Sequence, residues 1–196
     1  MDLTAPAISL EALYVLALSC GMRQGEILGL RWRDVVLDGP TPQIKVRHAL
    51  QSIDGRLQLV DTKTERSKRE IDLPEPALSI MRRHLAGLAA LPLPDAYVFA
   101  TSTGNPLSGR NVTRSFKAAL RGAGLPTLTR FHDLRHSYGS LSLATGTDIV
   151  TISHNMGHSS PRVTESVYLH SSQRGRRLAQ ERLGQALSAV RLVTTG

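Results

Sequence analysis

Two segments of this sequence place arginine, carboxylate and histidine side chains at helical spacing. Arg23 precedes Glu26 by three residues, so the two side chains share one face of a helix. A carboxylate behind an arginine holds the guanidinium in one rotamer, and bidentate recognition of a phosphate requires such a fixed fork. His132, Arg135 and His136 follow the same rule, at spacings of three and four residues. Taken alone, each segment is more typical of a surface ion pair or a capped helix than of a phosphate site.

Three further residues complete a set that suits phosphoryl transfer. Lys63 lies in a polar turn, His158 follows a predicted helix end, and Tyr168 comes ten residues later. A tyrosine hydroxyl can act as a covalent nucleophile, but its pKa of about 10 demands a base or strong electrostatic help. The transition state also needs donors at its non-bridging oxygens. Singly, each residue is typical of a solvated or core side chain; together they favour phosphoryl transfer.

The histidines also fit a second interpretation, as metal ligands. His132 and His136 stand four residues apart, and so do His154 and His158, a spacing at which two imidazoles can bind one ion. No glutamate lies between the members of either pair, as the zinc-protease motif would require. A His-metal hydrolase therefore stays open as a minor alternative.

The charge balance points to a polyanionic partner. The 196 residues include 24 lysines and arginines against 16 acids, a formal net charge of +8. A basic surface of this size favours nucleic acid, although a generally basic protein has the same composition. Aromatic residues make up only 4% of the chain, which disfavours a platform for stacking single-stranded bases. Contact with the backbone of duplex DNA is the better expectation.

Other features of the composition exclude several protein classes. No apolar run approaches the roughly 18 residues of a membrane span, and the start of the chain lacks the basic region of a secretory signal. Cys20 is the single cysteine, which excludes an internal disulfide framework and a cysteine-rich zinc module. We expect a reducing compartment, the cytoplasm.

Hydrophobic periodicity and turn residues predict a mainly α-helical α+β fold with a small antiparallel β-sheet. Asp54-Gly55 is typical of a hairpin turn between strands. Strands are predicted over 43–50, 57–60 and 70–73, and helices over 9–19, 23–30, 76–90, 111–122, 133–144, 149–156, 161–168 and 173–190.

Four segments, in this order, resemble the motifs of the tyrosine recombinase (phage integrase) family. They are LALSCGMRQGEILGLRWRDV, TKTERSKREIDLP, FHDLRHSYGS and MGHSSPRVTESVYLH. The resemblance covers the chain from about Leu13 to His170. It implies a catalytic domain that cuts and rejoins duplex DNA through a 3′-phosphotyrosine, with neither a metal ion nor a nucleotide cofactor.

The resemblance also implies a role for each residue that matches a motif. Tyr168 would be the nucleophile, and Arg23 and Arg135 would clamp the scissile phosphate. Glu26 would support the first arginine rather than act directly. These roles follow from the resemblance and not from spacing.

Proton transfer and oxyanion stabilisation would fall to the histidines and a lysine. His158 would donate to a non-bridging oxygen, and His132 would help to take the tyrosine proton. Lys63 would protonate the 5′-oxygen leaving group, with Lys68 as a rival in the same segment. His136 would be structural support.

We expect residues 1–196 to form a single catalytic domain without the N-terminal core-binding domain that the family usually carries. Residues 1–170 would be its core, and 171–196 a helical tail, exchanged between protomers or packed on its own domain. The expected partner is double-stranded DNA, bound by a homotetramer, with a monomer off DNA left open. Asn155 replaces an apolar residue of the motif, which puts the local helix packing in question. A DNA-binding module that keeps this fold without cleaving is the main alternative.

Overall fold

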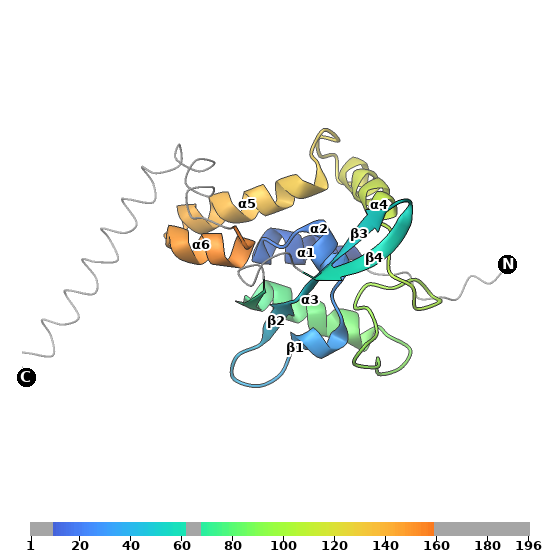
Figure 1. The fold of residues 1–196 in the computed structure, drawn as a ribbon. Helices are drawn as coiled ribbons and strands as arrows, with labels where there is room; N and C mark the ends of the chain where they lie inside the picture. The colour runs from blue at the N-terminus through green and yellow to red at the C-terminus, as the bar shows by residue number, and fades with distance from the viewer. Residues whose placement is uncertain (1–9, 62–67, 159–196) are drawn as a thin grey trace, which may run out of the picture.

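A computed structural model describes residues 10–61 and 68–158. Helices dominate it, and short antiparallel strands follow the first helices, so the predicted α+β class is confirmed (Figure 1). The elements, in chain order, are α1 (Leu10–Cys20), α2 (Gln24–Leu28), the 3₁₀ turn η1 (Trp32–Asp34), β1 (Val35–Val36), β2 (Gln43–Val46), β3 (His48–Ile53), β4 (Arg56–Asp61), β5 (Arg69–Asp72), α3 (Glu75–Ala86), α4 (Gly109–Gly122), α5 (Phe131–Ala144) and α6 (Ile149–Met156).

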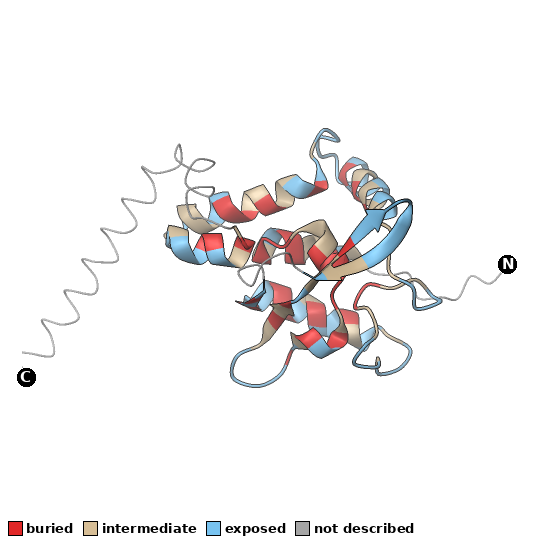
Figure 2. Ribbon diagram, viewed as in Figure 1, coloured by how far each residue is buried: buried red, intermediate tan, exposed pale blue. Residues whose placement is uncertain are grey.

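Helix α1 occupies the centre of the fold because it is apolar on most of its faces. It packs against α3 on one side and α5 on the other, and buried residues recur along it (Figures 1 and 2). Leu13, Leu16 and Ala17 are fully buried. Cys20, its last residue, is also fully buried. Burial raises the pKa of the Cys20 thiol to about 12, against the opposing charge of Arg69. The thiol is therefore a core side chain.

The strands form two small sheets rather than one. Strand β2 pairs antiparallel with β1 and with β5, and Ile44 lies opposite Ile71 in the second pair. Strands β3 and β4 form a separate hairpin. Its turn residues, Asp54 and Gly55, have φ angles of 50° and 76°, as the predicted Asp-Gly turn requires.

The single strand predicted over 43–50 is wrong, because the chain leaves the first sheet at Arg47. Its Nε lies 2.9 Å from Oδ1 of Asp34, a carboxylate that is almost fully buried. This ion pair ties the break between β2 and β3 to the η1 turn. Alternation of side chains continues across the break, so the sequence pattern alone does not reveal it.

The helices after the sheet differ from the prediction mainly at their ends. Helix α3 stops at Ala86 instead of 90, where the N–H of Gly87 donates to the carbonyl oxygen of Arg83. Helices α4 and α5 each start two residues earlier than predicted. Rings of Tyr14, Phe116 and Phe131 pack together and join α1, α4 and α5. In the described part of the chain, every helix is too short or too polar to span a bilayer.

Candidate functional site

Arg23 stands at the N-terminal end of α2, directly behind Glu26. Its backbone N–H donates to Oε2 of Glu26 at 2.8 Å, and its Nη1 donates to Oε1 at 2.9 Å. The second terminal nitrogen of the guanidinium, Nη2, donates to the carbonyl oxygen of Gly157 at 3.1 Å. The Arg23 side chain is 41% exposed, whereas the Glu26 side chain is 4% exposed. The carboxylate therefore holds a guanidinium that still reaches solvent.

A second arginine, which is absent from the predicted site, binds the same carboxylate. Arg69, the first residue of β5, donates from Nη1 to Oε1 of Glu26 at 3.1 Å and from Nη2 to Oε2 at 2.8 Å. Burial alone would raise the pKa of the Glu26 carboxyl, but the bonds and charges of Arg69 and Arg23 outweigh it and lower that pKa. Alternation offered a signal, since Arg69 shares a strand face with the buried Ile71.

Helix α5 supplies the second cluster of predicted residues. Arg135 is 2% exposed, and its Nη1 donates to the carbonyl oxygen of Gly21, two residues before Arg23. The rings of His132 and His136 lie 4.8 Å apart, edge to face. The predicted spacing on one helical face therefore holds.

His158 directly follows the end of α6. Asp148 caps the start of this helix, because its carboxylate accepts from the N–H groups of Val150 and Thr151. Gly157 ends it with φ 60° and ψ 45°, a left-handed conformation that glycine adopts without strain. The N–H of His158 then donates to the carbonyl oxygen of Ser153 at 3.0 Å. A capped helix with a fixed end thus positions the half-buried imidazole.

Asn155, the departure from the motif, is accommodated by two hydrogen bonds. Its Nδ2 donates to the Tyr138 hydroxyl at 2.9 Å, and its carbonyl oxygen accepts from Nε of Arg69 at 2.7 Å. The questioned helix packing is intact: Met156 and Ile152, the apolar residues beside it, are fully buried.

The pKa values of His132 and His158 are lowered, in part by the positive charges of nearby arginines. Burial, followed by the charges of Arg135, Arg23 and Arg69, lowers the pKa of His158 to about 4. Burial and the neighbouring His136 and Arg135 lower the pKa of His132 in the same direction. Both imidazoles are therefore neutral at pH 7, in a field that attracts an anion.

The described residues of the predicted site thus lie together. Hydrogen bonds, a ring contact and the electrostatic influence of the arginines on His158 connect six of them: Arg23, Glu26, His132, Arg135, His136 and His158. Lys63 and Tyr168, as well as the tail 171–196, lie outside the described residues. Lys68, the rival lysine, is exposed beside β5.

A groove with a volume of about 1020 Å³ opens beside α2, between the β3–β4 hairpin and α4. Gln24, the neighbour of Arg23, lines it and donates from Nε2 to the Thr113 hydroxyl at 3.3 Å. Arg110 and Arg114 project from α4 along the groove and are exposed. Lys117 also lines it, and its Nζ donates to the carbonyl oxygens of Thr127 and Thr129.

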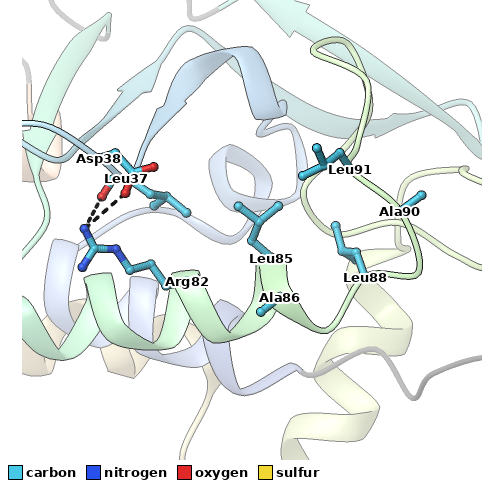
Figure 3. A pocket seen from close by; sticks show the side chains of 8 residues that line it. All are labelled: Leu37, Asp38, Arg82, Leu85, Ala86, Leu88, Ala90 and Leu91. Carbon is cyan, nitrogen blue, oxygen red and sulfur yellow. Dashed lines mark hydrogen bonds and ion pairs between the residues drawn. The ribbon is translucent and has the colours of Figure 1, made fainter.

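A second pocket, of about 370 Å³, contains none of the predicted site residues (Figure 3). It is lined mainly by leucine and alanine, with Arg82 at one end. Nη2 of Arg82 donates to the carbonyl oxygen of Leu37 at 2.8 Å and lies 3.4 Å from Oδ1 of Asp38. Within residues 10–61 and 68–158, no three histidine, cysteine or acidic side chains group as metal ligands.

The fold is that of tyrosine recombinase catalytic domains. The Tn1549 transposon integrase, solved with a circular-intermediate DNA, superimposes with a TM-score of 0.72 at 22% identity, over 89% of this chain and 58% of that one. The XerA recombinase gives a TM-score of 0.66 at 20% identity, over 90% and 57%. The chain belongs to the phage integrase family, whose model matches residues 2–174.

Individual relatives agree with this membership. An integrase of Streptomyces ambofaciens is 33% identical over 180 residues, which cover 84% of this chain and 45% of the relative. A XerC-like tyrosine recombinase of Caldanaerobacter subterraneus is 29% identical over 180 residues, covering 82% and 45%. The chain therefore spans about half the length of the curated relatives it matches.

Proposed function

We propose that this chain carries the catalytic site of a site-specific DNA recombinase that cuts and rejoins duplex DNA through a 3′-phosphotyrosine. The observation that carries the proposal is the convergence of Arg23, Arg135 and His158, which come from three distant parts of the sequence. Two guanidinium groups beside a neutral imidazole form a donor set for the non-bridging oxygens of one phosphate.

The cleavage step balances with residues of this chain alone. The Tyr168 hydroxyl oxygen attacks the phosphorus atom and forms a phosphorus–oxygen bond, while the bond to the DNA 5′ oxygen breaks. His132 takes the tyrosine proton, which its neutral imidazole supports, and Lys63 gives a proton to the leaving 5′ oxygen. A DNA 5′-hydroxyl reverses the step. The phosphotyrosine bond conserves the energy of the broken phosphodiester bond, so rejoining requires no nucleotide cofactor.

The groove beside α2 supports double-stranded DNA as the partner. Arg110 and Arg114 line it, next to the α2 turn that holds Arg23. Basic side chains along a groove can neutralise successive backbone phosphates and release counterions. The Tn1549 integrase, which shares this fold, was solved bound to DNA.

Covalent capture on DNA tests the proposal. The protein is incubated with a pool of duplexes that carry a nick near a randomised centre, because the nick traps the cleaved state. An adduct that survives denaturation should form with the wild type and with Tyr97→Phe, and should vanish with Tyr168→Phe. Incubation with EDTA should leave the yield unchanged.

The outcomes separate the candidate functions. If the protein binds DNA in a salt-sensitive manner but forms no covalent species on any duplex, it is a non-cleaving DNA-binding module and not a recombinase. An adduct that persists in Tyr168→Phe would remove this tyrosine from the mechanism. Loss of the adduct in EDTA would favour the His-metal alternative.

The assembly state belongs to the same proposal. We propose a homotetramer on DNA in which the tail 171–196 is exchanged between protomers. Light scattering with and without a captured duplex should give the tetramer mass only with DNA. Deletion of 171–196 should abolish the tetramer but leave single-site cleavage, whereas an unchanged tetramer would contradict the exchange.

A further inference from the structure

We propose that Arg69 is a positioning residue of the catalytic site, which fixes the phosphate-clamping Arg23 and the His158 turn relative to each other. This inference rests on the proposed function. Arg69 touches both elements at once: its guanidinium holds the Glu26 carboxylate behind Arg23, and its Nε holds the last turn of α6.

Each of the two oxygens of the Glu26 carboxylate accepts one hydrogen bond from Arg23 and one from Arg69. Oε1 accepts from Nη1 of Arg23 at 2.9 Å and from Nη1 of Arg69 at 3.1 Å. Oε2 accepts from the Arg23 backbone N–H and from Nη2 of Arg69, each at 2.8 Å. Because Arg69 binds with two parallel bonds, it sets the plane of the carboxylate and hence the direction of the Arg23 fork.

The third guanidinium nitrogen of Arg69, Nε, binds the last turn of α6. Nε donates to the carbonyl oxygen of Asn155 at 2.7 Å, three residues before His158. The α-carbon of Gly157 packs against the same guanidinium, since a Cβ there would lie 2.7 Å from Nη1 of Arg69. Arg23 closes the loop through its bond to the Gly157 carbonyl oxygen. Arg23, Arg69 and the end of α6 therefore form one connected unit.

The burial of the Arg69–Glu26 ion pair favours a role in positioning over a role in stabilising the fold. The side chains of Arg69 and Glu26 are 0% and 4% exposed, and the cost of removing two charges from water offsets most of their attraction. A buried ion pair of this kind is weak support for stability but gives a fixed geometry. Arg69 also begins β5 and follows Lys63 by six positions in the sequence. Arg69 thus connects the elements that carry two proposed catalytic residues, Arg23 and His158.

Lysine is the informative replacement at this position. Its single ammonium keeps the charge but lacks the planar fork, so it cannot bind both Glu26 oxygens and the Asn155 carbonyl oxygen together. Arg47→Lys is the matched control, because Arg47 also pairs with a buried carboxylate, that of Asp34, outside the site.

The experiment compares cleavage and binding on the captured nicked duplex. For Arg69→Lys, the single-turnover rate constant for adduct formation at saturating DNA should fall by about 100-fold, since catalytic groups displaced by about 1 Å lose that much. The Kd for DNA should stay within about threefold, because the Arg69 side chain is 0% exposed and offers DNA no surface. Arg47→Lys should change neither quantity. A merely structural arginine would lower the melting temperature without this split.

The outcomes remain distinct from those of the proposed function. Absence of an adduct in the wild type sinks recombination itself, whereas an Arg69→Lys protein that cleaves at the wild-type rate overturns only the positioning role. If Arg69→Lys does not fold, the double variant Arg69→Met/Glu26→Gln removes both buried charges together and should fold. That double variant should also cleave about 100-fold slower; wild-type cleavage would overturn the proposal equally.

Discussion

Nη2 of Arg23 donates a hydrogen bond to the carbonyl oxygen of Gly157 at 3.1 Å, although the two residues stand 134 positions apart. The bond joins the start of α2 to the turn that presents His158. Arg135 makes the reciprocal link, from α5 to the carbonyl oxygen of Gly21. Each guanidinium of the proposed clamp is thus held by backbone of another element, which preorganises it before DNA arrives.

Arg23→Ala should abolish cleavage with little effect on binding. Loss of one transition-state donor lowers the rate by about 100- to 1000-fold, while the duplex loses one phosphate contact among several. Adduct formation on the captured duplex measures the first quantity and a binding titration the second. Arg33→Ala, an exposed arginine paired with Asp95, is the matched control. If Arg23→Ala instead unfolds the protein, its role is structural and the clamp assignment fails.

The pKa of His158 should make stability depend on pH. The unfolded chain binds a proton at this histidine near pH 6.5, while the folded protein binds it near pH 4. Between these values the unfolded state holds more protons, so the free energy of unfolding falls as the pH drops from about 6.5 to 4. Arg135, Arg23, Arg69 and His136 are the charged and titratable neighbours that oppose protonation.

Urea unfolding between pH 4.5 and 7 measures this dependence. His158→Gln should flatten the slope in part, because the lowered pKa of His132 contributes with the same sign. Screening of the half-buried ring keeps the slope below one full proton. A slope identical to that of the wild type would mean that the imidazole titrates normally and does not sit in the positive pocket.

Two glycines with similar positive φ angles allow backbone strain to be separated from side-chain contact. Gly124 has φ 67° and open space around it, whereas Gly157 has φ 60° and packs against the Arg69 guanidinium. Gly124→Ala should cost about 1 kcal/mol of stability, and Gly157→Ala about 1 to 3 kcal/mol more, since the new methyl must displace Arg69. Urea midpoints give both values. Equal losses would show that the Arg69 contact at Gly157 is loose.

The groove beside α2 should account for part of the salt dependence of DNA binding. Arg110→Ala and Arg114→Ala should each reduce the slope of log K against log salt by about one, the effect of a lost phosphate contact. Arg82→Ala, at the second pocket, should leave the slope unchanged. If the α4 variants also leave it unchanged, the DNA path runs elsewhere on the molecule.

Sequence reasoning succeeded where a local rule sets the geometry. The Asp-Gly hairpin and the helical face shared by His132 and His136 each depend on residues a few positions apart. The helix predicted over 23–30 is shorter, since α2 spans Gln24–Leu28, and Arg23 meets Glu26 from the N-cap position in extended backbone. Sequence reasoning failed at Arg47 and at Arg69, whose positions depend on carboxylates 13 and 43 residues away, Asp34 and Glu26. Periodicity describes one element at a time, so it does not reveal which buried acid an arginine will meet.

The position of Cys20 provides the protein with a built-in chemical reporter. It is the only thiol of the 196 residues, it is fully buried, and its high pKa keeps it protonated at neutral pH. A thiol reagent can therefore modify it only when the interior opens. The rate of alkylation should measure that opening directly, and slower alkylation on adding a duplex would register the tightening of the core beneath the clamp.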